Sequence, residues 1–150
     1  MPDLSDILQI IRLQDNGLIE IYVDHVGLAE WNSVAFGLQS ISSSVIYQID
    51  ASDQPFDSVG AHMFETDCNG RYSIAFQIGR QTWTTGFYSA DQIDLQGDPR
   101  EVQDERDVGN VIDLLDRLHR ITGKTACLYA EGGRDMVSTP PIICMPDSSR

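Results

Sequence analysis

Residues 72–78 read Tyr-Ser-Ile-Ala-Phe-Gln-Ile, and this stretch decides the fold class. Every second residue from Tyr72 to Ile78 is apolar or aromatic, and the residues between them are small or polar. This period of two is that of a strand with one buried face, which is typical of antiparallel sheets. The pattern therefore predicts that an antiparallel sheet is the centre of the fold.

The flanking sequence predicts a meander over residues 61–88. A three-residue loop at 68–70 would place Phe64 opposite Ile74, with Gly70 in the left-handed position of a bulge. The same alternation continues through residues 83–87 as a further strand. Residues 92–95 are expected to add a short strand after it.

Two helices are expected before the meander. Residues 5–13 have apolar residues at helical spacing and Ser5 as a candidate N-cap, although a hairpin through Asn16-Gly17 is the alternative. Residues 28–40 carry one apolar stripe that includes Trp31.

The clearest helix is expected at residues 107–121. Its apolar stripe has a period of 3.6 residues, and Asp104 or Asp107 is placed to cap its start. Arg and His near its end suit the helix dipole, and Gly123 is placed as the left-handed residue that ends it.

The remaining segments complete an α+β fold. Strands are expected at 18–23, 45–49 and 125–130, with an edge strand at 140–144, where prolines cannot donate to a ladder. Segments 51–60 and 96–104 are expected to be linkers. The 150 residues therefore predict one α+β domain, with a mainly antiparallel sheet of about 5–7 strands covered by two or three helices.

The shared faces of these elements predict one core. The residues expected to be buried together are Trp31, Leu38, Ile74, Phe76, Val111, Leu115 and Leu118.

Charge is the most informative bulk property. The chain has 23 acidic and 10 basic residues, and its net charge is −13. Such a field repels nucleic acid and anionic membranes, and it speeds association with a basic partner. No apolar run approaches the length of a membrane span. Because of this and of the negative charge, neither nucleic acid nor a membrane is expected as a partner.

The cysteines and the N-terminus favour the cytoplasm. The three cysteines are scattered, without the spacing of a disulfide framework or a metal site, so three free thiols are expected. Cys127 and Cys144 lie in apolar runs, and Cys68 lies in a turn. The first residues carry acids where a signal peptide needs basic residues.

No motif for catalysis was found. The three histidines are isolated, there is no nucleophile with a nearby base, and no calcium-loop order is present. Gly123-Lys124-Thr125 ends a helix instead of beginning one, so it is not a phosphate loop. The chain is therefore expected to be no enzyme and to hold no metal or cofactor.

The densest acidic group spans residues 91–107. The residues expected to bind a partner are its carboxylates Asp91, Asp94, Asp98, Glu101, Asp104 and Glu105. A second group is Asp50, Asp53, Asp57, Glu65 and Asp67. A solvated loop with a capped helix start is one interpretation, and a docking surface for a basic protein is another. A calcium site is the third, although the residue order of a calcium loop is missing. None of these carboxylates is flanked in sequence by the apolar wall that raises a pKa. Tyr72 and Tyr88 are the candidate aromatic anchors.

The layout resembles a known group of proteins. Its motifs are residues 18–24 leading to Trp31, residues 98–102, and the helix end at 115–124 followed by residues 128–131. This order is similar to immunity proteins of bacterial polymorphic-toxin and contact-dependent growth inhibition systems. The resemblance covers most of the chain as a layout. It implies a small cytoplasmic protein, encoded beside a toxin, that binds and blocks the toxin's active domain.

The leading hypothesis is therefore inhibition of a toxin, perhaps a nuclease, by an acidic surface that covers its active site. The alternative is a small-ligand protein or metabolic enzyme, which a pocket lined by a histidine and a shifted carboxylate would favour. A third hypothesis is a mimic of nucleic acid, which needs acids spaced like phosphates.

Overall fold

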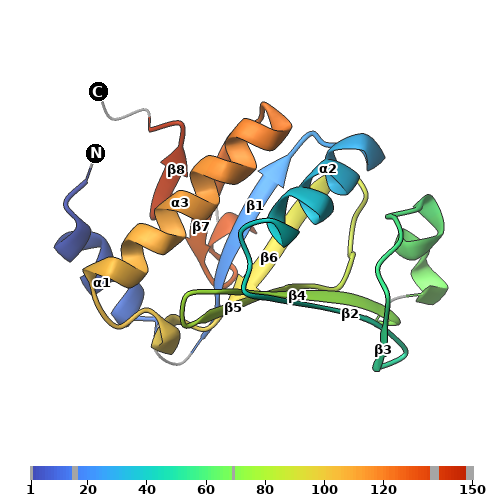
Figure 1. Ribbon diagram of the computed structural model, residues 1–150. Coiled ribbons are helices and arrows are strands. Elements are labelled where there is room, and N and C mark those ends of the chain that lie inside the picture. The colour runs from blue at the N-terminus through green and yellow to red at the C-terminus, as the bar shows by residue number, and fades with distance from the viewer. Residues whose placement is uncertain (1, 15–16, 69, 136–138, 148–150) are drawn as a thin grey trace.

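The computed structural model contains one antiparallel sheet with helices on one side of it (Figure 1). It describes residues 2–14, 17–68, 70–135 and 139–147. The predicted α+β class is confirmed, with eight strands and three α-helices among these residues.

All neighbouring strands of the sheet are antiparallel, in the order β3-β2-β4-β5-β6-β1-β7-β8. The strands are β1 (Ile19–Asp24), β2 (Ser44–Ile49), β3 (Ser52–Gln54), β4 (Tyr72–Ile78), β5 (Gln81–Thr85), β6 (Gln92–Gly97), β7 (Ala126–Ala130) and β8 (Ile143–Met145). Both edge strands, β3 and β8, have three residues. β8 overlaps the edge strand expected at 140–144, whereas the unexpected β3 raises the number above the expected range. β3 lies inside a segment that was expected to be a linker.

Helices α1 (Leu4–Arg12), α2 (Leu28–Gln39) and α3 (Glu105–Thr122) lie on the same side of the sheet (Figure 1). The short 3-10 helices are η1 (Ala61–Phe64), η2 (Thr66–Cys68), η3 (Pro99–Glu101) and η4 (Gly133–Asp135). β1 lies between β6 and β7, so its pairing partners are both distant in sequence.

The capping residues explain where the helices begin and end. Asp3, rather than Ser5, caps α1, because its carboxylate accepts the Ser5 N–H at 2.8 Å. Asp104 caps α3 by accepting the Asp107 N–H at 2.9 Å. Gly123 ends α3 with φ 71, the left-handed conformation expected for it.

The pairing expected between Phe64 and Ile74 across a loop at 68–70 is wrong. Residues 61–68 form η1 and η2 instead of a strand, and β4 pairs with β2, so that Tyr47 lies opposite Ile74. Phe64 packs against the aromatic ring of Trp31. Of the expected loop, Gly70 is left-handed, with φ 79, and Asn69 lies outside the described residues.

The sheet changes direction between β5 and β6. Within the described strands, β5 joins β6 through the single pair Thr84 and Gln96. Figure 1 shows β2 and β4 running at a steep angle to β1 and β6. β5 ends at Thr85, and Phe87, expected in this strand, follows it with φ 55 and lies in the core.

The predicted core is confirmed. All seven residues expected to be buried together belong to one cluster of buried hydrophobic side chains between the sheet and the helices. Ile19, Ile21 and Val23 of β1 contribute side chains with 0% exposure. No helix among the described residues is long and apolar enough to cross a membrane.

The expectation of three free thiols is wrong. Cys127 on β7 and Cys144 on β8 are directly opposite each other and form a disulfide, and Cys68 is free. The two cysteines are 17 residues apart, and only the antiparallel pairing of their strands brings them together. The cysteine pattern therefore no longer supports a reducing compartment.

Candidate functional site

The six carboxylates predicted to bind a partner do not form one surface. Asp91 precedes β6 and Asp98 follows it, so an extended strand separates them by roughly 20 Å. Asp91 is exposed at one end of the strand. Asp98, Glu101, Asp104 and Glu105 lie at the other end, around η3 and the start of α3.

Asp94, one of the six carboxylates expected to bind a partner, is buried. Its side chain is 5% exposed, in the middle of β6. It lies opposite Tyr22 of β1, on the face of the sheet away from its buried neighbours Ile93 and Leu95. Alternation along β6 turns Asp94 away from the helices, but the surrounding side chains still cover it.

Most carboxylates at the other end of β6 have structural partners. Asp98 binds Arg100 through both carboxylate oxygens, and these hydrogen bonds hold the pKa of Asp98 below its usual value. Glu101 accepts the Thr82 N–H at 3.0 Å. Asp104 caps α3 and lies 3.3 Å from Arg80. These contacts agree with the interpretation of a capped helix start, and Glu105 alone of the four is exposed without such a role.

The second acidic group lies around β3 and η2. Asp50 pairs with Arg71 at 3.3 Å, and Asp53 accepts a hydrogen bond from Gln48. Glu65, Asp67 and Cys68 have ligand atoms within 4.8 Å of one another, the one such group among the described residues. Both of its carboxylates are exposed, and we assign no metal to it.

The face of the sheet that points away from the helices was not predicted as a site. We call it the open face, and none of the three described helices covers it (Figure 1). The central strands present half-buried short or neutral side chains there: Ser73, Ala75, Gln77, Thr82, Thr84 and Gln96. None of the eight described strands contains Lys or Arg.

An acidic centre lies on the open face where β1 runs between β6 and β7. We define it as Glu20, Tyr22, Asp24 and Asp94. Glu20 is 9% exposed and accepts two hydrogen bonds, from the Gly132 N–H at 2.8 Å and from the Tyr22 hydroxyl at 3.0 Å. The segment after β7 thus folds back over the open face and helps to bury this carboxylate.

Arg134, from η4, is the cation of the acidic centre. Its guanidinium lies 4.8 Å from the centre of the Tyr22 ring and forms an ion pair with Asp24. Tyr129 of β7 packs edge-on against Tyr22 at 6.0 Å. Arg134 therefore faces three carboxylates, and Lys124 shares a recess with Tyr22 and Asp24. Within the described residues the acidic centre still has more negative than positive charge, which favours further positive charge there.

Among the described carboxylates with a shifted pKa, Asp94 has the pKa that lies farthest from its usual value. Burial raises the pKa of Asp94 from 3.8 to about 6. A long hydrogen bond of 3.4 Å from the Thr85 hydroxyl opposes this rise, the nearby Glu20 carboxylate adds to it, and Arg134 opposes it. The expectation that no carboxylate has a raised pKa is therefore wrong, because distant segments supply the covering that the local sequence lacks.

A recess of about 430 Å³ adjoins the acidic centre. Tyr22, Asp24, His25, Lys124 and Tyr129 line it. His25 has φ 61, a left-handed conformation that is uncommon for a residue other than glycine. Asp94 does not line this recess, so the histidine and the shifted carboxylate do not face one shared cavity.

Two sequence signals point to the open face in retrospect. No Lys or Arg occurs between Arg12 and Arg71, so this whole stretch is acidic or neutral. Glu20, Tyr22 and Asp24 alternate with the apolar residues of β1, which puts their side chains on one face. Neither signal indicates that β6 lies beside β1 and brings Asp94 into the same group.

No protein family, curated protein or solved structure was found to match this chain.

Proposed function

We propose that this chain is an immunity-type binding protein that neutralises a basic partner protein and docks on it through the open face. The observation that carries the proposal is a broad sheet face that no described helix covers, with an acidic centre and no Lys or Arg in its strands. The partner would be a toxin domain whose basic, substrate-binding face is occluded.

The charge of the chain supports a basic protein as the partner. The net charge of −13 repels nucleic acid, and the acids of the open face would meet a positive patch with complementary potential. Arg134 neutralises only part of the acidic centre. A basic side chain from a partner would complete this neutralisation.

The side chains of the open face suit binding. Ser, Thr and Ala on strands lose little conformational freedom on contact, which lowers the cost of association. Tyr22 and Tyr129 supply rigid aromatic surface of the kind enriched at binding hot spots. We therefore replace the earlier candidate anchors, Tyr88 and the buried Tyr72, with the two tyrosines of β1 and β7.

This proposal changes the expected binding residues. It centres on Glu20, Asp24 and Asp94, with Asp91 at the nearby end of β6. Asp98, Glu101 and Asp104 support local structure, so reversing their charges would disturb the fold before it tested binding.

The proposal places the chain in the cytoplasm, where an immunity protein meets its toxin. The bond between Cys127 and Cys144 is instead typical of an oxidising compartment. Alkylation of the protein in intact cells, followed by mass measurement, tests this part. Three alkylated cysteines support the cytoplasm, and a protected pair supports export.

The binding experiment compares two Gln→Lys substitutions, one on the open face and one on a helix on the other side of the sheet. Gln96→Lys adds a positive charge to the open face beside Glu20, and Gln39→Lys adds the same charge on exposed α2. Each variant is co-expressed with the toxin domain encoded by a neighbouring gene, and cell survival and affinity are measured. We expect Gln96→Lys to weaken binding at least tenfold and to abolish protection, because like charges across an interface are costly.

The control decides how the result is interpreted. Gln39→Lys should bind as the unaltered protein does. Equal effects of the two substitutions would reject the open face as the docking surface. Failure to bind any neighbouring gene product would reject the immunity function itself.

The recess beside His25 favours a second candidate, a small-ligand protein. Its two tyrosines, histidine and aspartate offer both stacking and hydrogen bonds. A panel of metabolites titrated into the isolated chain would shift the NMR signals of His25 and Tyr129 saturably if this function is right. A pure binding protein would show these shifts only with its protein partner.

A further inference from the structure

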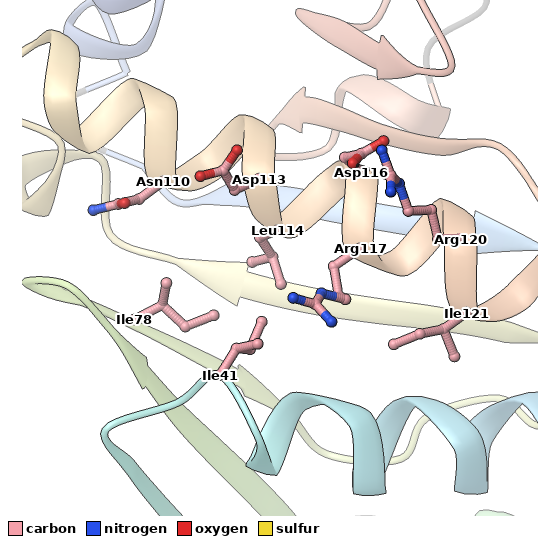
Figure 2. A pocket seen from close by; sticks show the side chains of 9 residues that line it. All are labelled: Ile41, Ile78, Asn110, Asp113, Leu114, Asp116, Arg117, Arg120 and Ile121. Carbon is pink, nitrogen blue, oxygen red and sulfur yellow. Dashed lines mark ion pairs between the residues drawn. The ribbon is translucent and has the colours of Figure 1, made fainter.

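A groove on the helix side of the molecule is independent of the open face. It has a volume of about 560 Å³ and lies between α3 and the end of α2, above the end of β4. Figure 2 shows the side chains that line it. We call it the α3 groove.

Apolar side chains form the floor of the α3 groove. Ile41 follows α2, Ile78 ends β4, and Leu114 and Ile121 come from α3. Figure 2 shows these four side chains converging on the space between the two helices. Leu114 is 1% exposed and anchors the floor in the core, whereas the other three are only half-buried.

α3 carries two aspartate–arginine pairs with the same spacing but different geometry. Asp116 and Arg120, four residues apart, form an ion pair at 2.9 Å. Asp113 and Arg117 have the same spacing, yet no ion pair of Arg117 occurs among the described residues. Figure 2 shows Arg117 bent over the groove toward Ile41, and Asp113, Asp116 and Arg120 also line it.

An exposed guanidinium that extends over an apolar floor has a defined preference for ligands. It presents fixed N–H donors that match a carboxylate, and such charge-assisted hydrogen bonds strengthen as water is excluded. The apolar floor continues beneath this charge, so a ligand with a carboxylate at one end and an aliphatic chain at the other satisfies both.

We propose that the α3 groove is a binding site for an aliphatic carboxylate, with the carboxylate on Arg117 and the chain along Ile41 and Ile78. The site does not depend on the proposed immunity function. Its ligand is negative, whereas the partner of the open face is positive.

The test titrates decanoate into the isolated full chain and follows binding by calorimetry and NMR. We expect saturable binding with shifts at Ile41 and Ile78. Shortening the chain one methylene at a time should weaken binding two- to fourfold per step, which corresponds to partial to full burial of each group. Decanol and acetate, which each lack one half of the ligand, should bind at least tenfold more weakly.

Two matched variants locate the site. Arg117→Gln should weaken decanoate binding at least tenfold, whereas Arg106→Gln, which removes an exposed arginine from the first turn of α3 outside the groove, should leave it unchanged. Ile41→Glu, which places a carboxylate opposite Arg117, should abolish binding.

Three outcomes would overturn the proposal. They are equal binding of decanol and decanoate, equal loss in the Arg117 and Arg106 variants, and no saturable binding of any carboxylate. Tighter binding of a short peptide that ends in leucine would reassign the groove to a protein partner. The binding measurement needs no toxin, so its failure leaves the proposed function of the open face intact.

Discussion

At the scale of single residues, burial decides the chemistry of the open face. Asp94 and Glu20 are both nearly buried carboxylates, but they have different partners. Glu20 accepts a backbone N–H and a tyrosine hydroxyl, whereas Asp94 receives one long hydrogen bond from Thr85. Few donors therefore compensate the charged form of Asp94 for the water that it loses.

Asp94 should make stability depend on pH. Its pKa is about 6 in the folded chain, above the unfolded value of 3.8. The folded state therefore holds its proton more tightly, and the free energy of unfolding should fall as pH rises from about 4 to 6. Asp94→Asn should remove this fall and stabilise the protein at pH 8 by roughly 2–3 kcal/mol. Urea unfolding at several pH values measures both effects.

The control for this prediction is Asp113→Asn, which removes an exposed carboxylate on α3. It should leave the pH profile between 4 and 6 as it is in the unaltered protein. An unchanged slope in Asp94→Asn would show that the side chain is hydrated in solution.

At the scale of elements, α3 is the part of the fold that the local sequence predicts most completely. It has a side-chain cap, a left-handed glycine and one apolar stripe, and each is readable from local sequence. The stripe packs into the core at Val108, Val111, Leu115 and Leu118, which are all 0% exposed. Local pattern and tertiary burial therefore agree along this helix.

Leu115→Ala tests the packing of α3. It should lower the free energy of unfolding by about 2–5 kcal/mol, because it leaves a cavity among buried side chains. Leu13→Ala makes the same chemical change at a side chain that is 79% exposed and should change stability by less than about 0.5 kcal/mol. Chemical denaturation that gave equal values for the two variants would disprove the assignment of the buried face.

The edge pair β7–β8 depends on a covalent bond as well as on its ladder. The disulfide closes a loop with a sequence separation of 17, so Cys144→Ser should lower the free energy of unfolding by about 3 kcal/mol. Reductant should destabilise the unaltered protein by a similar amount. Cys68→Ser should keep this response to reductant. Insensitivity of the unaltered protein to reductant would show that the two thiols stay unpaired.

At the scale of the whole molecule, the basic residues lie outside the strand layer. The eight described strands contain no Lys or Arg, whereas α3 carries three arginines together with four acidic residues. For the open face we therefore propose a basic partner. For the α3 groove we propose an anion on Arg117, which has no ion pair with the described residues.

The rate of association with a basic partner should reflect this layering. Charges on the open face are screened beyond about 8 Å at physiological ionic strength, so the association rate should fall roughly tenfold from low to high salt. Stopped-flow mixing with the toxin domain measures this rate, and the dissociation rate should change less. An association rate independent of salt would contradict a steering role for the acidic centre.

Much of the fold was predictable because its signals are local. The seven core residues, the three helices and the central strand at 72–78 follow from periodicity within a dozen residues. The strand predicted at residues 61–68 was wrong because the apolar residues there are compatible with either a strand or short turns. Only competition with β2 for the edge of β4 decided between these two structures.

The candidate site was less predictable, because pairing across distant segments creates it. The sequence alone determined an acidic α+β domain, since net charge and periodicity need no partner. Tertiary structure alone decided that β1 lies between β6 and β7, that Asp94 is buried, and that Cys127 meets Cys144. The physical reason is that alternation sets the face on which a side chain lies, whereas its burial and its partners depend on strands and loops far away in sequence.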